Sequence, residues 1–291
     1  MAKARAIIKR RKAVANIRKI TQTMQLIATA RFQKCLQRAT AGKPYTNKLT
    51  EMIQTLAGVE SAEHPLLQPV AGVERSVLLV ITSNRGLCGA YNASVLRAAT
   101  ERRKHLEQQG LTASIEMVGK KGVGYARFLG WSLVERITDV EDKIAYARVA
   151  TMAERYMQQY TARQIARVDV AYTRFLSIGV QRATVAQLLP IVPPEGDAAK
   201  GGARPDFEFS PPPEILLARL IPESVKVRLY QYFNDSIVSE QVARMTAMKS
   251  ATDAAAEMIK SLGTQYNRAR QSQITMELAD IVGGANAVEG K

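Results

Sequence analysis

The chain of 291 residues is long enough for one large domain or two modest ones, and its 46% hydrophobic content can bury a normal core. Lys and Arg number 41 against 26 Asp and Glu, a formal charge of +15. This composition excludes a disordered chain, and no run approaches the ~20 consecutive apolar residues of a membrane span. Nucleic acid, anionic lipid and an acidic protein remain open as partners.

The positive charge is concentrated at the start of the chain. Residues 1–50 contain thirteen Lys or Arg and no acid, the first carboxylate being Glu51. Organelle transit peptides are also basic, but they are usually rich in serine, and the first serine here is Ser61. The pattern therefore favours a basic contact surface over a transit peptide.

The two cysteines, Cys35 and Cys88, form no CxxC pair and lie in segments of different character. Such isolated cysteines are more typical of a reducing compartment than of a disulfide scaffold. We therefore expect a cytoplasmic protein.

Both ends of the chain have the spacing of long helices. Between residues 3 and 56, Ile17, Ile20, Met24 and Ile27 recur in steps of three and four, although Gly42–Pro44 predicts a kink or interruption. A longer seam near the other end consists of Met245, Met248, Thr252, Ala255, Ile259, Leu262, Tyr266 and Ala269. We expect the two seams to pack together as an antiparallel coiled coil, with helices roughly 80 to 110 Å long at 1.5 Å per residue.

The middle of the chain alternates between strand and helix patterns. The expected strands are 76–82, 114–118, 131–137, 168–175 and 184–191, and the expected helices are 90–109 and 143–164. The predicted fold is α+β/α/β, a long antiparallel coiled coil with a central Rossmann-like α/β domain. The expected divisions are an N-terminal helix at 1–57, the central domain at 58–213 ending in a Pro- and Gly-rich loop, and a C-terminal helix at 214–291.

The sequence predicts no catalytic, cofactor or metal site. The glycine-rich segment 119–124 (GKKGVG) lacks the Lys and Ser or Thr that follow the second glycine of a phosphate loop, so we interpret it as a basic turn at a helix start. Cys88 follows a strand, but neither His64 nor His105 is placed near it as a base, which favours a buried thiol. Two histidines and two distant cysteines also show no metal-ligand spacing.

Several segments, in the right order along the chain, resemble the gamma subunit of bacterial F-type ATP synthases. They are residues 7–11 (IIKRR), 16–24 (NIRKITQTM), 83–89 (SNRGLCG), 240–253 (EQVARMTAMKSATD), 266–271 (YNRARQ), 274–278 (ITMEL) and 281–285 (IVGGA). These segments cover both ends and one point in the middle. The chain departs from the family at Asn84, where Asp is common, and at 195–213, which matches poorly.

The resemblance implies a non-catalytic rotor shaft that couples proton or sodium flow to ATP synthesis, at the cytoplasmic face of the bacterial inner membrane. Its implied partners are the alpha and beta subunits, the epsilon subunit and the membrane c-ring. Met24 would face an acidic segment of beta with the cations Arg10, Arg11 and Lys19 nearby, and Phe207 would contact epsilon or the ring. A beta loop would meet Arg270, Gln271, Thr275 and Glu277.

Two other functions are compatible with part of the pattern. The charge of +15 suggests a nucleic-acid-binding protein, but the sequence has no helix-turn-helix, zinc spacing or aromatic strip. A thiol-dependent transferase built on the α/β unit would depend on Cys88 alone. Salt-dependent filter binding tests the first function, and labelling of Cys88 with iodoacetamide tests the second.

Overall fold

The computed structural model describes residues 2–57, 64–192 and 212–289. The chain forms two compact units, one made of Met1–Ala28 with Arg244–Lys291 and the other of Thr29–Ala243. Within the described ranges, none of the helices combines the length and the apolar character needed to cross a bilayer.

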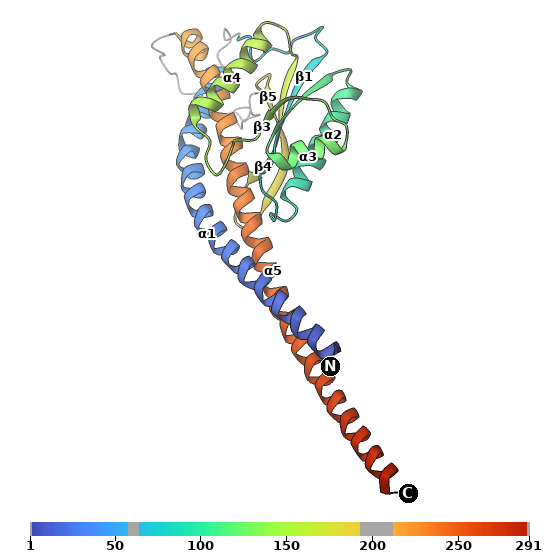
Figure 1. Cartoon of the computed structure of the whole chain (residues 1–291). Coiled ribbons are helices and arrows are strands. Elements are labelled where there is room, and N and C mark those ends of the chain that lie inside the picture. The colour runs from blue at the N-terminus through green and yellow to red at the C-terminus, as the bar shows by residue number, and fades with distance from the viewer. Residues whose placement is uncertain (1, 58–63, 193–211, 290–291) are drawn as a thin grey trace, which may run out of the picture. The chain divides into compact units, whose positions relative to one another are not determined.

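Two helices far longer than the others occupy the ends of the chain (Figure 1). Helix α1 covers Ala2–Ala57 and helix α5 covers Pro213–Glu289, as the sequence predicted. Of the kink or interruption predicted at Gly42–Pro44, the interruption was wrong, since α1 runs through Pro44. Buried residues on both sides, Ala39 and Leu49, hold this part of the helix in the core and offset the hydrogen bond that proline removes.

The first unit is an antiparallel pair formed by the start of α1 and the end of α5. Val14 packs with Ala255 and Leu262, while the hydroxyl of Thr252 donates to that of Thr21 at 2.8 Å. Residues later in α1 therefore contact residues earlier in α5, so the two helices run antiparallel as in the predicted coiled coil.

The predicted seam of α5 is confirmed, because all eight seam residues, from Met245 to Ala269, are buried or half-buried. The predicted seam of α1 was wrong: Ile17, Ile20 and Ile27 are 52%, 59% and 48% exposed. The buried positions are Val14, Thr21 and Ala28, one heptad apart. Their small side chains allow the two backbones to approach closely, so the larger isoleucines are left on the outer surface.

The second unit is built on a five-stranded sheet of order β3-β2-β1-β4-β5. The strands are β1 (Arg75–Ile81), β2 (Thr112–Val118), β3 (Leu133–Ile137), β4 (Arg167–Phe175) and β5 (Gln181–Leu189). Strands β1 to β4 are parallel and β5 is antiparallel to β4. The predicted Rossmann-like domain is confirmed, with element bounds displaced by up to three residues.

Helices cover both faces of this sheet. One core contains Leu79 and Ile81 of β1, helix α4 (Tyr146–Thr161) and residues of α1 and α5 from the same unit. The other contains Leu78 and Val80 with helices α2 (Tyr91–Gln108) and α3 (Lys120–Phe128). Because successive strand residues point to opposite faces, the uninterrupted apolar run of β1 supplies both cores.

Candidate functional site

In the second unit, the loop after β3 is bonded to both terminal helices through Asp142. The Asp142 carboxylate accepts hydrogen bonds from Arg31 Nη1 at 2.5 Å and from Gln241 Nε2 at 2.8 Å. Its backbone oxygen lies 3.6 Å from the Cys35 thiol, whose pKa is raised mainly by burial. These contacts attach α1 and α5 to the α/β fold, and no sequence pattern predicted this role for Asp142 or Gln241.

The turn after β1 positions the same loop. The Asn84 amide donates to the Val140 carbonyl at 2.6 Å, and its side-chain oxygen accepts from the Lys120 backbone at 3.0 Å. Asn84 therefore joins the end of β1, the start of α3 and the loop that contains Asp142. The side chain at this position needs both a donor and an acceptor, which an ionised aspartate cannot supply.

The glycine-rich segment has the backbone of a helix start, but its amides are occupied by the chain itself. The Gly119 amide donates to the Ile137 carbonyl at 2.8 Å, the Lys121 amide to Ser83 at 3.1 Å and the Gly122 amide to the Thr82 hydroxyl at 3.0 Å. Phosphate loops bind anions through such amides when they point at the ligand. The bonds within the chain support the interpretation of this segment as structural.

Cys88 is a buried side chain with polar neighbours. It is 2% exposed, and the Asn92 amide donates to its sulfur at 3.2 Å. His105 lies near the far end of α2, which begins just after this turn at Tyr91. In the described parts of the chain, no group of three or more His, Cys, Asp or Glu could hold a metal ion.

A buried carboxylate bonds α4 to the sheet. Glu116 of β2 accepts hydrogen bonds from Tyr156 Oη and from Arg155 Nη2, both at 2.6 Å. Arg155 also donates to Glu135 of β3. Burial raises the pKa of the Glu116 carboxyl above its usual value.

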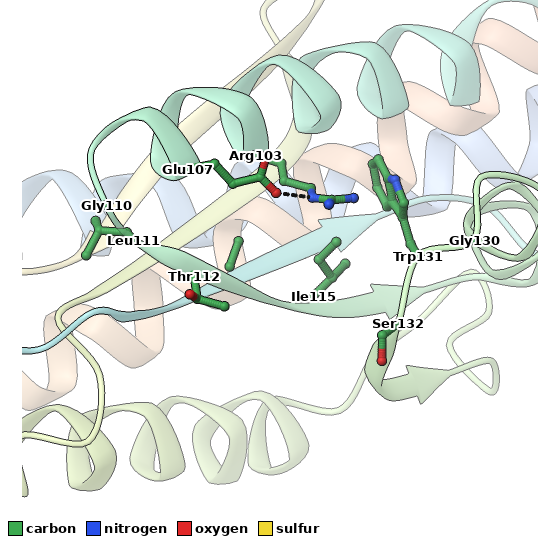
Figure 2. Close-up of a pocket in the computed structure, with 10 residues that line it drawn as sticks. Arg103, Glu107, Gly110, Leu111, Thr112, Ile115, Gly130, Trp131 and Ser132 are labelled. Atoms are coloured by element: carbon green, nitrogen blue, oxygen red, sulfur yellow. Dashed lines mark hydrogen bonds and ion pairs between the residues drawn. The ribbon is translucent and has the colours of Figure 1, made fainter.

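A cleft of about 510 Å³ opens between the end of α2, β2 and the turn before β3 (Figure 2). The Arg103 guanidinium lies 5.3 Å from the centre of the Trp131 ring and is paired with Glu107 at 2.8 Å. The only strong cation among its lining residues is thus already neutralised, which leaves little charge for a ligand.

The residues that the resemblance assigned to contacts on α1 lie in the first unit. Arg10, Arg11 and Lys19 are exposed and Met24 is half-buried. They share α1 with Ile17 and Ile20, so exposed apolar and cationic side chains occupy the same stretch of helix. Their spacing predicted that the isoleucines lie in the seam, because apolar spacing alone does not distinguish an internal partner from an external one.

The four contact residues assigned to α5 lie in its last turns. Arg270, Gln271, Thr275 and Glu277 are all exposed. The Thr275 hydroxyl donates to the Gln271 carbonyl at 3.0 Å and the Gln273 amide to Glu277 at 2.8 Å. Among the described residues, no hydrogen bond or ion pair connects these four residues to Arg10, Arg11 or Lys19. Phe207 lies outside the described residues.

Large apolar side chains are exposed on the same turns of α5. They are Ile274, Met276, Leu278, Ile281 and Val282, between 51% and 69% exposed. Exposed apolar side chains that lie close together are typical of a surface that contacts another molecule.

Comparison with known proteins covers the entire chain. The family model described as ATP synthase matches residues 3–288. The chain is 46% identical to the ATP synthase gamma chain of Rhodopirellula baltica and 38% identical to that of Gemmatimonas aurantiaca, covering 100% of both sequences in each pair. A chain of the Euglena gracilis mitochondrial ATP synthase has a similar fold, with a TM-score of 0.71 at 18% identity, covering 99% of this chain and 95% of that one. These whole-length matches show that the chain belongs to the ATP synthase gamma chain family.

Proposed function

We propose that the chain is the central rotor shaft of an F-type ATP synthase and that it couples ion-driven rotation of a membrane ring to conformational change at catalytic sites on other subunits. The observation that carries this proposal is the 46% identity over full length to an ATP synthase gamma chain. The chain itself is the non-catalytic part of the machine.

The first unit has the physical properties that a shaft requires. Two helices with an interlocked seam resist twisting better than a single helix. The exposed surface is also asymmetric, with Ile17 and Ile20 on α1 and a different apolar set on the last turns of α5. As such a shaft turns, chemically identical sites meet different surfaces, and the site with the more favourable contact is shifted toward one conformation.

Three cations on α1 are the proposed contacts with an acidic segment of the beta subunit. Arg10, Arg11 and Lys19 are exposed, and the first fifty residues supply no carboxylate that could neutralise them. Their attraction for acidic groups sets the angle that the shaft prefers. Met24, half-buried beside them, would add apolar contact.

On α5, Arg270, Gln271, Thr275 and Glu277 are the proposed polar contacts with a loop of beta. Their exposure and their position within one and a half turns or so of exposed apolar residues support this assignment. Polar contacts of this type can form and break at each step because they are not buried in the free chain.

The α/β domain within the second unit is proposed to lie outside the catalytic ring and to contact the epsilon subunit and the c-ring, with Phe207 in that contact. The Euglena gracilis structure contains OSCP, F1 and the c-ring, and the Tetrahymena thermophila structure a central stalk and c-ring. We place the complex peripherally at the cytoplasmic face of the bacterial inner membrane. Residues 1–57 and 214–291 would be the shaft helices and 58–213 the side domain.

Assembly with purified alpha and beta subunits tests this function. We expect a particle that contains one copy of this chain and hydrolyses ATP faster than alpha and beta alone. A chain that does not enter the particle, or that binds salt-dependently to nucleic acid instead, would refute the proposal.

A further inference from the structure

A basic and apolar surface lies where α3 leads into β3, and it is used by none of the contacts described above. It consists of Arg127, Phe128, Leu129, Val134 and Arg136, named here the α3–β3 surface. Phe128 is 84% exposed, Val134 67% and Leu129 40%. An aromatic ring held this far into solvent costs free energy in an isolated chain and is typical of a contact surface.

Beside these residues is a cleft of about 270 Å³ whose walls include Arg127, Trp131 and Arg136. The Trp131 ring is held in place, since the Tyr125 ring meets its edge at 6.1 Å and the Arg103 guanidinium lies over it at 5.3 Å. A fixed aromatic wall with an exposed aromatic ring nearby can receive an apolar side chain at little entropic cost.

The charge of the surface is uncompensated. Arg127 and Arg136 are both exposed, and neither forms an ion pair with another described residue. The nearest acid in sequence, Glu135, is bonded to Arg155 of α4. The two free guanidinium groups therefore favour a partner that carries carboxylates.

We propose that the α3–β3 surface binds an acidic segment of another polypeptide, with its carboxylates on Arg127 and Arg136 and an apolar side chain against Phe128 and the Trp131 cleft. This proposal does not depend on the rotor function. It makes the outer edge of the sheet a docking site for a protein of opposite charge.

A second copy of the chain fits this surface poorly. In a twofold contact the same patch meets itself, so the two arginines of one copy would face those of the other. Pairing through the free edge of β3 is also hindered, because β3 has five residues and its register shift leaves Val134 without a partner on β2. Short, bulged edge strands resist addition of a further strand.

A fluorescein-labelled peptide that alternates Glu with Leu and Phe is the probe, and its counterpart has Lys in place of each Glu. Fluorescence anisotropy with the full chain should show at least roughly tenfold tighter binding of the Glu peptide. Arg127→Glu with Arg136→Glu should reverse this preference, and Phe128→Ala should weaken binding of the Glu peptide roughly tenfold.

The controls are Arg182→Glu near the start of β5 and Ile178→Ala in the β4–β5 turn, which change another exposed cation and another exposed apolar residue. Both controls should bind the Glu peptide as the unmodified chain does. An unchanged preference in the doubly reversed variant would show attraction by the overall charge of +15 and would overturn the proposal. The proposal would also be overturned if the unmodified chain bound phosphatidylserine vesicles and not the Glu peptide, and if the doubly reversed variant lost the vesicle binding. That result would identify a lipid-binding surface.

Discussion

The Gln241 side chain of α5 donates a hydrogen bond of 2.8 Å to the carboxylate of Asp142, which lies in the loop after β3. Gln241 is only 1% exposed, and Asp142 also binds Arg31 of α1. One carboxylate in the second unit thus holds both long helices to the α/β fold. A torque applied to these helices would pass to the sheet through this bond and the apolar core around it.

Asp142→Ala should lower the free energy of unfolding by about 1–2 kcal/mol, because it leaves the buried Gln241 amide without this acceptor. Urea denaturation of the full chain measures the change. Asp139→Ala is the matched control, since Asp139 is exposed and pairs with Arg148 on the surface. A loss for the control as large as that for Asp142→Ala would show that the Asp142 bonds add no more than a surface ion pair.

Asn84→Asp should be destabilising by about 1 kcal/mol, although Asp is common at this position in the family. The carboxylate cannot donate to the Val140 carbonyl, which lies 2.6 Å from the amide nitrogen. It would still accept from the Lys120 backbone. Thermal unfolding measures the effect, and an equal or higher melting temperature for Asn84→Asp would show that the Val140 bond does not stabilise the turn.

Val14→Ala and Ile17→Ala separate the seam of the first unit from its outer surface. Val14 is 8% exposed and packs on α5, so its truncation should cost about 1–2 kcal/mol for two buried methyl groups. Ile17 is 52% exposed, and its truncation should leave the unfolding free energy within about 0.5 kcal/mol. Equal losses in denaturant unfolding would place both residues in the seam, contrary to the structure.

Glu116 should give the stability of the chain a dependence on pH. Its native pKa lies above the ordinary value of 4.5 because of burial, so the native state holds the proton where the unfolded chain has lost it. This contribution to stability is complete below pH of about 4.5 and is lost as pH rises through the native pKa. Glu116→Gln should therefore flatten the decline of unfolding free energy above that pH.

The control for this titration is Glu107→Gln, which changes an exposed carboxylate of α2. Guanidinium denaturation of each variant between acid and neutral pH gives the slope. A slope for Glu116→Gln that equals those of the control and of the unmodified chain would assign the pH dependence to other groups.

Arg270→Ala and Gln271→Ala test the proposed contacts of α5. Both residues are exposed, so the unfolding free energy should change by no more than about 0.5 kcal/mol. ATP turnover of the assembled particle should fall severalfold, since each change would remove a proposed polar contact with beta. Full turnover in both variants would separate these residues from the proposed role, and Gln265→Ala, also exposed on α5, is the control.

The sequence predicted an element correctly where a single pattern, such as the spacing of apolar residues, determined its structure. The seam of α5 was correct because small and apolar residues recur there over many turns. The seam of α1 was not, because an isoleucine that contacts another protein has the same spacing as one that contacts α5. Where helix α3 lies, the sequence predicted only a basic turn, because the segment contains Gly122 and Gly124, which have low helix propensity. In the structure this low propensity is outweighed by the packing of Gly122 against Thr82 and Met117.

The Asp142 contacts could not be predicted, because they join residues about one hundred positions apart in sequence. A single carboxylate in a loop has no periodicity to reveal its partners. The resemblance, in contrast, supplied proposed contact residues such as Arg10 and Arg270, which folding energetics could not indicate because their side chains are exposed in the free chain.

Rotation of the chain inside an assembled particle tests the central claim most directly. Cys35 and Cys88 are 3% and 2% exposed, so Ser177→Cys on the exposed β4–β5 turn would provide the accessible thiol for attachment of a bead. With alpha and beta fixed to a surface and ATP supplied, the bead should turn continuously in one direction. A particle that hydrolyses ATP while its bead only fluctuates about a fixed angle would contradict the account.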